Sequence, residues 1–409
     1  MQTSSLRRWT APFALVAASA LVLSACGGAS DTASSATSAA GSAVSSATSA
    51  AGSAVSSATA SSSAASGSAT SGSAGSSSAS SAAVPDGDPV SVTLITKDST
   101  NPFWIAMQEG AQKAAGELNG VTITIAAGKA DGDEQGQVDA IEQSIARGDK
   151  GILITPNGPA VNPAIEKARA AGLFVIALDT PPDPADTVDI TFATDNFSAG
   201  NLVGEWAKGS LAGQKATIAL LDAFNDKIVT VDVNRDQGFL SGMGIDVADK
   251  TVKGDEAKTG SYDGGEYEIA CQEASQATPD GGKTAMENCL AANPDINVVY
   301  TINEQAAIGA ASALQAAGKT DTLVVSVDGG CEGVSNVKNG TIGATSQQYP
   351  LLMAQLGVNA IVTIARGGEK PAVTEGLDFY DTGVALVTDK PVDGVDSIDT
   401  TEGTNLCWG

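Results

Sequence analysis

The chain of 409 residues contains no histidine. Histidine is the commonest general base and the commonest metal ligand, so Ser-His-Asp, Cys-His and histidine-based metal sites are excluded. Positive charge is also scarce, with 22 lysines and arginines against 47 acidic residues and a formal net charge of −25. This acidity argues against nucleic acid or an anionic lipid surface as the main partner. Carboxylates alone can still catalyse, so these shortages make an enzyme less expected without excluding one.

One long apolar run stands at the amino terminus. It covers residues 11–23, follows Arg7 and Arg8, and is too short to span a bilayer comfortably, which is typical of a signal peptide. The run ends in Leu23-Ser24-Ala25-Cys26, which resembles the bacterial lipobox, whose cysteine receives a diacylglyceryl group. We therefore predict a lipoprotein signal peptide at 1–25 and a lipid anchor at Cys26. The alternative is an ordinary signal peptide that is cleaved nearby.

Large side chains are almost absent from residues 27–83, which consist mainly of Ser, Ala, Gly and Thr. The segment SSATSAAGSAV at 34–44 recurs unchanged at 45–55. A segment with so little apolar surface cannot offset its ordering entropy, so we predict a disordered linker over 26–87. Such a linker would tether the remaining chain to the membrane, and its many hydroxyl groups leave O-glycosylation open.

From residue 90 onward, apolar runs of strand length alternate with helical patterns. The predicted strands are 90–95, 121–126, 151–155, 174–178, 190–193, 216–221, 298–301, 323–327 and 341–345. The predicted helices are 102–118, 134–147, 163–171, 199–211, 237–243, 305–317 and 351–365. Nearly continuous apolar strands that alternate with helices indicate parallel sheets covered on both faces. The fold class predicted is α/β, with two doubly wound lobes and no cofactor.

Seven short motifs resemble one family, the sugar-binding proteins of ABC importers, close to ribose-, galactose- and fructose-binding proteins. They are Thr100-Asn-Pro-Phe-Trp104, Ile154-Thr-Pro156, Val175-Ile-Ala-Leu-Asp179, Ala193-Thr-Asp-Asn196, Arg235-Asp-Gln-Gly-Phe239, Ile302-Asn-Glu304 and Val325-Ser-Val-Asp-Gly329. Each motif is weak alone, but all seven occur in the order of the family, and the resemblance covers essentially all of residues 90–390. The phrases at 126–129 and 192–197 are nearest the fructose-type branch.

The resemblance implies a type I periplasmic binding protein fold. One lobe would comprise residues 88–194 plus 349–378, and the other 195–348 plus 379–409, with a three-crossing hinge between them. The cleft between the lobes would close on the sugar and present a new surface to the permease.

A sugar presents many hydroxyls and flat C–H faces, so its site needs planar polar side chains and aromatic rings. By resemblance, the ligand-binding residues are Asn101, Phe103, Trp104, Asp179, Arg235, Tyr262, Asn303, Asp328 and Gln348. Tyr262 is assigned on a divergent loop at 253–265, and Lys97 either touches the ligand or edges the cleft. The ribose-type pattern has arginine where this chain has Thr180, which puts ribose itself in doubt.

Several of these residues also have a purely structural interpretation. Asn101 precedes a proline and suits a helix cap. Phe103 and Trp104 begin a helix and could pack in the core. Asp179 could be a solvated turn residue, and Arg235 a partner in a surface ion pair.

Two acidic features invite other interpretations. Asp179 and Asp328 could form a glycosidase pair, but both match the binding-protein pattern better. The stretch Asp131-Gly-Asp-Glu134 lacks the spacing and terminal glutamate of a calcium-binding EF-hand loop, so we expect a solvated loop before a helix and no metal.

Four cysteines remain besides Cys26, an even number that suggests two disulfides in an exported chain. Three connectivities are possible. A local bridge between Cys271 and Cys289, closing a Gly- and Pro-containing insertion, is the first choice. Cys331 would then pair with Cys407 and fasten the tail to the loop after Asp328. A zinc site is the weaker interpretation, because no C-x-x-C pair is present.

These features predict an extracytoplasmic, lipid-anchored, monomeric solute-binding subunit of an ABC importer. It would capture a monosaccharide, fructose-like or ribose-like, deliver it to the permease subunits, and catalyse nothing. One alternative is a sugar-sensing receptor that signals to a membrane kinase or chemoreceptor, and another is a surface glycosidase. Related DNA-binding repressors share the fold, but the export signal and the acidity argue against that role.

Overall fold

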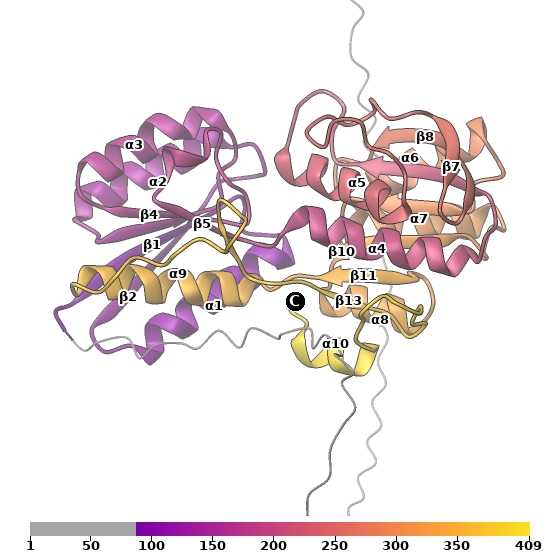
Figure 1. The fold of residues 1–409 in the computed structure, drawn as a ribbon. Helices are drawn as coiled ribbons and strands as arrows, with labels where there is room; N and C mark the ends of the chain where they lie inside the picture. The colour runs from indigo at the N-terminus through magenta and orange to yellow at the C-terminus, as the bar shows by residue number, and fades with distance from the viewer. Residues whose placement is uncertain (1–86) are drawn as a thin grey trace, which may run out of the picture. The chain divides into compact units, whose positions relative to one another are not determined.

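The computed structural model describes residues 87–409, in which strands and helices alternate to build two sheets (Figure 1). The predicted signal peptide, the predicted anchor at Cys26 and the predicted linker, apart from Gly87, lie outside the described residues. Residues 87–409 belong to one compact unit. None of the helices in this part of the chain is long and apolar enough to cross a membrane.

The first lobe is built on a six-stranded parallel sheet in the order β12-β5-β4-β3-β1-β2. Its elements are β1 (Val90–Thr96), α1 (Pro102–Glu117), β2 (Val121–Ala127), α2 (Glu134–Arg147), β3 (Gly151–Ile154), η1 (Pro159–Val161), α3 (Asn162–Ala170), β4 (Phe174–Leu178), η2 (Ala185–Thr187), β5 (Ile190–Ala193), α9 (Pro350–Ala365) and β12 (Tyr380–Asp381).

The second lobe has a seven-stranded sheet in the order β13-β11-β10-β9-β6-β8-β7, antiparallel only at its two edge strands. Its elements are α4 (Asn196–Leu211), β6 (Ala216–Asp222), α5 (Thr230–Met243), β7 (Thr259–Tyr262), β8 (Gly265–Ala274), α6 (Pro279–Ala292), β9 (Val298–Thr301), α7 (Glu304–Ala316), β10 (Leu323–Asp328), α8 (Cys331–Lys338), β11 (Ala344–Gln347), β13 (Ala385–Val387) and α10 (Thr400–Leu406).

Each sheet is covered by helices on both faces, as its apolar strands predict. In β4, Phe174, Ile176 and Leu178 pack with α1 and α9, whereas Val175 and Ala177 pack with α2 and α3. In the second lobe, α4 and α5 cover one face of the sheet, and α6 and α7 cover the other. This arrangement confirms the predicted α/β fold with two doubly wound lobes.

The chain crosses between the lobes three times: after β5, after β11 and after β12. The third crossing comes later than the boundary predicted at residue 378. Tyr380 and Asp381 pair with Phe192 and Ala193 of β5, and the rings of Tyr380 and Phe192 lie 5.0 Å apart. This short strand therefore completes the edge of the first sheet.

Helix α5 starts at Thr230, well before the predicted start at 237. Its first half is mainly polar and lacks a helical apolar pattern, although most of it is buried. Helices α4 and α5 pack closely through glycines. A Cβ on Gly200 would lie 2.1 Å from the carbonyl oxygen of Arg235, and one on Gly238 would lie 2.2 Å from that of Phe197. This close approach sets the position of Arg235 at the edge of the second lobe.

The structure pairs Cys271 with Cys289, and Cys331 with Cys407, which is the pairing that the sequence favours. The first disulfide joins β8 to α6. The second joins the start of α8 to the residue after α10. The insertion that the sequence placed between Cys271 and Cys289 contains the end of β8 and most of α6.

Candidate functional site

A cavity of about 250 Å³ lies between the two lobes, at the carboxyl ends of their strands. Ligands of open α/β sheets bind at this edge. Eight of the nine predicted ligand residues line the cavity: Asn101, Phe103, Trp104, Asp179, Arg235, Asn303, Asp328 and Gln348. Lys97 also lines it, with its Nζ atom 5.5 Å from the centre of the Trp104 ring.

The loop from β1 to α1 supplies the aromatic wall of the cavity. Asn101 caps α1, because its Oδ1 accepts a hydrogen bond from the backbone N–H of Phe103 at 3.0 Å. Pro102 occupies the first turn, where its missing N–H costs no helical hydrogen bond. The Phe103 and Trp104 rings meet edge to face, with centroids 4.7 Å apart, and both belong to the first-lobe core. The structural interpretation is therefore confirmed for these residues, and their role toward a ligand stays a prediction that their place in the cavity wall supports.

Asp179 follows β4 in a left-handed backbone conformation, with φ of +64°. Residues other than glycine adopt this region rarely, and such outliers gather at functional sites. The side chain is buried, and its Oδ2 accepts a hydrogen bond from the Thr180 hydroxyl at 2.7 Å. Thr180, which stands where the ribose-type pattern has arginine, thus binds the acid directly.

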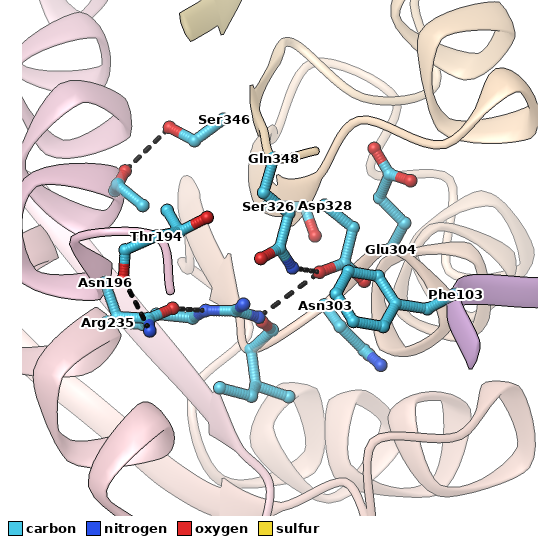
Figure 2. Close-up of polar contacts among 12 residues, drawn as sticks. Phe103, Thr194, Asn196, Arg235, Asn303, Glu304, Ser326, Asp328, Ser346 and Gln348 are labelled. Carbon is cyan, nitrogen blue, oxygen red and sulfur yellow. Dashed lines mark hydrogen bonds and ion pairs between the residues drawn. The ribbon is translucent and has the colours of Figure 1, made fainter. Parts of the chain in front are cut away.

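The second lobe supplies a polar network centred on Arg235, which is only 4% exposed. Its Nε donates to Asn196 Oδ1 at 2.8 Å, and its Nη1 donates to the Ile302 carbonyl oxygen at 2.9 Å. Nη1 also forms an ion pair with Asp328 Oδ1 at 3.3 Å (Figure 2). The guanidinium is therefore oriented by three acceptors within the protein, and its ion pair with Asp328 is buried and not at the surface.

Asp328 ends β10 with φ of +139°, a second strained acid in the cavity. Gln348 Nε2 donates to Asp328 Oδ1 at 2.7 Å, so Gln348 and Arg235 converge on the same oxygen (Figure 2). Burial raises the pKa of the Asp328 carboxyl to about 6, although Arg235 and the hydrogen bond from Gln348 oppose that rise. Above that pH the carboxylate is a charged acceptor for a ligand hydroxyl.

Two side-chain amides of the second lobe differ in whether each of their polar atoms has a hydrogen-bond partner. Asn303 caps α7 through Oδ1, which accepts from the Ala306 N–H at 3.0 Å, and its Nδ2 donates to the Ala277 carbonyl at 3.2 Å. Gln348 Oε1, in contrast, is a buried oxygen without a hydrogen-bond partner among residues 87–409. Since buried acceptors are nearly always satisfied, Gln348 Oε1 is ready to accept a ligand hydroxyl.

Tyr262 is the one predicted ligand residue that the structure does not bring to the cavity. It lies in the β7–β8 hairpin and packs in the second-lobe core. Its hydroxyl donates to the Gln214 carbonyl oxygen at 3.1 Å. The divergent loop that carried the assignment forms an edge hairpin, which turns the ring away from the strand ends.

Glu304, which the sequence did not single out, lies directly behind Asp328. Its carboxylate accepts hydrogen bonds from the N–H groups of Gly329 and Gly330 at 2.9 and 3.0 Å, and from the Thr345 hydroxyl at 2.7 Å. Burial, followed by the charge of Asp328, raises the pKa of Glu304 to about 8. A glutamate in the first turn of a helix is usually exposed, so the sequence does not indicate that Glu304 is buried. Gly333 is a weak indication, because a Cβ there would lie 1.8 Å from Glu304 Cδ.

Other residues complete the wall of the cavity, among them Asp131, Phe224, Asp232 and Gln276. Asp133, two residues after Asp131, caps α2 through Oδ1, in agreement with the predicted loop before a helix. No group of three or more acidic or cysteine side chains in residues 87–409 is arranged to hold a metal ion. The site as a whole offers aromatic faces, carboxylates, amides and one guanidinium, which is the chemistry that binds a small polyhydroxylated solute.

Comparison with known proteins agrees with this geometry. The family described as periplasmic binding protein domain matches residues 92–370. The chain is 27% identical over 278 residues to the ribose import binding protein RbsB of Salmonella typhimurium, covering 68% of this chain and 85% of that protein. It is 25% identical over 304 residues to the D-allose-binding periplasmic protein of Escherichia coli, covering 72% and 91%.

A solved structure gives the same result. The fold is similar to that of an ABC transporter solute-binding protein from Agrobacterium vitis with bound D-fucose, with a TM-score of 0.63, 26% identity, and coverage of 78% of this chain and 100% of that one. The chain therefore belongs to the periplasmic binding protein domain family, which confirms the predicted resemblance to sugar-binding proteins of ABC importers and the expectation of a binding protein in place of an enzyme.

Proposed function

We propose that this protein is the extracytoplasmic solute-binding subunit of an ABC importer, and that it captures one monosaccharide between its lobes for delivery to a permease. The observation that carries the proposal is the joining of an aromatic wall, Phe103 and Trp104, to the hydrogen-bonded network of Arg235, Asp328 and Gln348 around one cavity. Rings stack on the C–H face of a sugar while the network binds its hydroxyls.

The size of the cavity supports a small ligand. At about 250 Å³ it falls just below the range of roughly 300–1,000 Å³ that is usual for drug-sized molecules. The names of the ribose- and allose-binding relatives support an aldose as the ligand. The segments at 126–129 and 192–197, in contrast, resemble the fructose-type branch and favour fructose. Thr180 takes the place of the arginine of the ribose-type pattern, so the hydroxyl pattern that is recognised differs around Asp179.

A thermal-shift screen of the purified protein against ribose, allose, fructose, fucose and glycerol tests the proposal. A ligand that binds only the native state raises the melting temperature by mass action. We expect one monosaccharide to give the largest shift and Asp328→Ala to abolish it. The matched control is Asp321→Asn, which removes an exposed acid just before the opposite end of β10 and should keep the shift. Absence of a shift with every sugar would contradict the proposal.

The lipid anchor at Cys26 is the second part of the proposal, supported by the Leu23-Ser24-Ala25-Cys26 pattern. A lipid-modified protein partitions into the detergent phase of a phase-separating detergent, because its acyl chains are strongly apolar. We expect the full-length protein from a bacterial host to enter that phase and Cys26→Ser to move it to the aqueous phase. Equal partitioning of the two proteins would refute the anchor.

A further inference from the structure

The last ten residues of the chain lie against the candidate sugar site. Helix α10 ends at Leu406, and the chain then passes through Cys407, which is bonded to Cys331, to Trp408. Cys331 follows Asp328 by three residues, so the disulfide attaches the tail to the loop that carries a ligand acid. The Cys331 N–H also donates to the Trp408 carbonyl oxygen at 2.9 Å.

Trp408 joins this second-lobe loop to the first lobe. Its ring meets the Phe103 ring edge to face, with centroids 5.1 Å apart, and it belongs to the same core cluster as Phe103 and Trp104. Only 8% of Trp408 is exposed. The Phe103 ring therefore has two edge-to-face neighbours, Trp104 and Trp408.

The indole of Trp408 also fixes the backbone at a hinge crossing. Its Nε1 donates to the Gln348 carbonyl oxygen at 2.9 Å, while the Gln348 side chain donates to Asp328. One residue earlier, Gln347 Nε2 donates to the carbonyl oxygens of Gly329 and Gly403, at 2.8 and 3.1 Å. The tail is thus hydrogen-bonded both to the loop after Asp328 and to the crossing segment at Gln347 and Gln348.

We propose that Trp408 is a positioning residue of the sugar site, held in place by the Cys331–Cys407 disulfide, and that it sets the placement of Phe103 and Gln348 toward the ligand. This rests on the proposed function. Trp408 does not line the 250 Å³ cavity and instead lines a neighbouring one that shares Asn101, Asn303 and Asp328 with it. Its effect on binding therefore acts through the residues it supports.

The test is a calorimetric titration of the sugar that gives the largest thermal shift, using Trp408→Ala, Trp408→Phe and the pair Cys331→Ser with Cys407→Ser. We expect about tenfold weaker binding for Trp408→Ala, because a ring pair and a hydrogen bond are both lost. Trp408→Phe should restore most of the affinity by keeping the edge contact. The pair Cys271→Ser with Cys289→Ser is the matched control, since it removes the disulfide of β8 and α6 and should leave affinity unchanged.

A double-mutant cycle separates positioning from general stability. If Trp408 acts through Phe103, the loss caused by Trp408→Ala shrinks in a Phe103→Leu background. Fully additive losses would overturn the proposal, as would equal losses of affinity from the two cysteine pairs.

Hydrogen exchange without sugar keeps the inference apart from the proposed function. Loss of the Cys331–Cys407 bridge should speed exchange at residues 103–106 and 329–331, whereas loss of the other bridge should not. Faster exchange confined to residues 400–409 would overturn the positioning role. If the wild-type protein binds none of the sugars, the proposed function is wrong. The exchange rates of the cysteine variants would still show whether the tail positions residues 103–106 and 329–331.

Discussion

The two halves of the candidate sugar site are held in place by different forces. In the first lobe, Phe103 and Trp104 are fixed by packing, since both rings belong to the apolar core that α1 and α9 form with the sheet. In the second lobe, Arg235, Asp328 and Gln348 are fixed by one another, through hydrogen bonds of 2.7–3.3 Å. One half is a wall of rings and the other a network of charges and amides.

This difference indicates how each half contributes to binding. A ring held in a core needs no reorganisation to stack on a ligand, and its loss affects stability as much as affinity. A buried charged network is costly to desolvate, and its loss leaves partners unsatisfied. We therefore expect polar substitutions in the second lobe to reduce affinity more than apolar ones in the first.

The largest effect is expected from Arg235→Lys. Lysine keeps the charge but cannot reach Asn196, the Ile302 carbonyl and Asp328 with one fixed fork. We expect about a hundredfold loss of sugar affinity by calorimetry, which corresponds to two lost charge-assisted hydrogen bonds. The control is Arg169→Lys, which alters a half-exposed arginine paired with Asp189 and should bind like the wild type. Similar sugar affinities for the two variants would show that the Arg235 network does not contribute to sugar binding.

Phe103→Leu should have the next largest effect. Leucine keeps a buried apolar side chain but has no flat face for a sugar, so we expect about a tenfold loss of affinity. Phe174→Leu makes the same change in the same core cluster, at a ring that does not line the cavity. Both variants should melt at a lower temperature, and only Phe103→Leu should bind more weakly. If both bind normally, the aromatic wall is structural only.

We expect Glu304→Gln to weaken the pH dependence of the unfolding free energy. Burial raises the pKa of Glu304 from 4.5 to about 8, so the folded protein holds this proton between those values while the unfolded chain releases it. The stability that the proton supplies is fully present below pH 4.5 and is lost as the pH rises through 8, with a slope of at most about 1.4 kcal/mol per pH unit.

Urea unfolding of both proteins from pH 5 to 9 measures this slope. The stability of the wild type relative to Glu304→Gln should fall as the pH rises, because glutamine cannot ionise. Glu332→Gln, at an exposed position in the first turn of α8, serves as the control and should follow the wild type. Parallel curves for wild type and Glu304→Gln would show that Glu304 titrates as an ordinary glutamate.

The fold and eight of the residues that line the cavity were predictable from sequence because both depend on local order along the chain. An apolar strand that ends in Asp179 or Asp328 places that acid at the ligand edge of a parallel sheet, whatever packs around it. The motif that contains Arg235 likewise belongs to a single element, helix α5.

Features that depend on distant partners were not predictable. The environment of Glu304 is set by Gly329 and Gly330, which follow β10, and by Thr345, which lies in β11. Trp408 meets Phe103 where a disulfide and hydrogen bonds hold the tail against the loop after Asp328 and the Gln348 backbone. Such long-range contacts leave no periodic signal in the sequence.

The smallest effect on binding is expected from Tyr262→Phe. Tyr262 is predicted as a ligand residue but does not line the cavity. The Tyr262 hydroxyl donates to the Gln214 carbonyl within the second-lobe core, so its removal should cost about 1 kcal/mol of unfolding free energy. Sugar affinity should stay within twofold of the wild type, because no atom of Tyr262 lines the cavity. Denaturant unfolding and calorimetric titration measure the two quantities on the same samples. A large loss of affinity with unchanged stability would mean that the β7–β8 hairpin swings toward the ligand, and it would return Tyr262 to the site that its sequence position predicts.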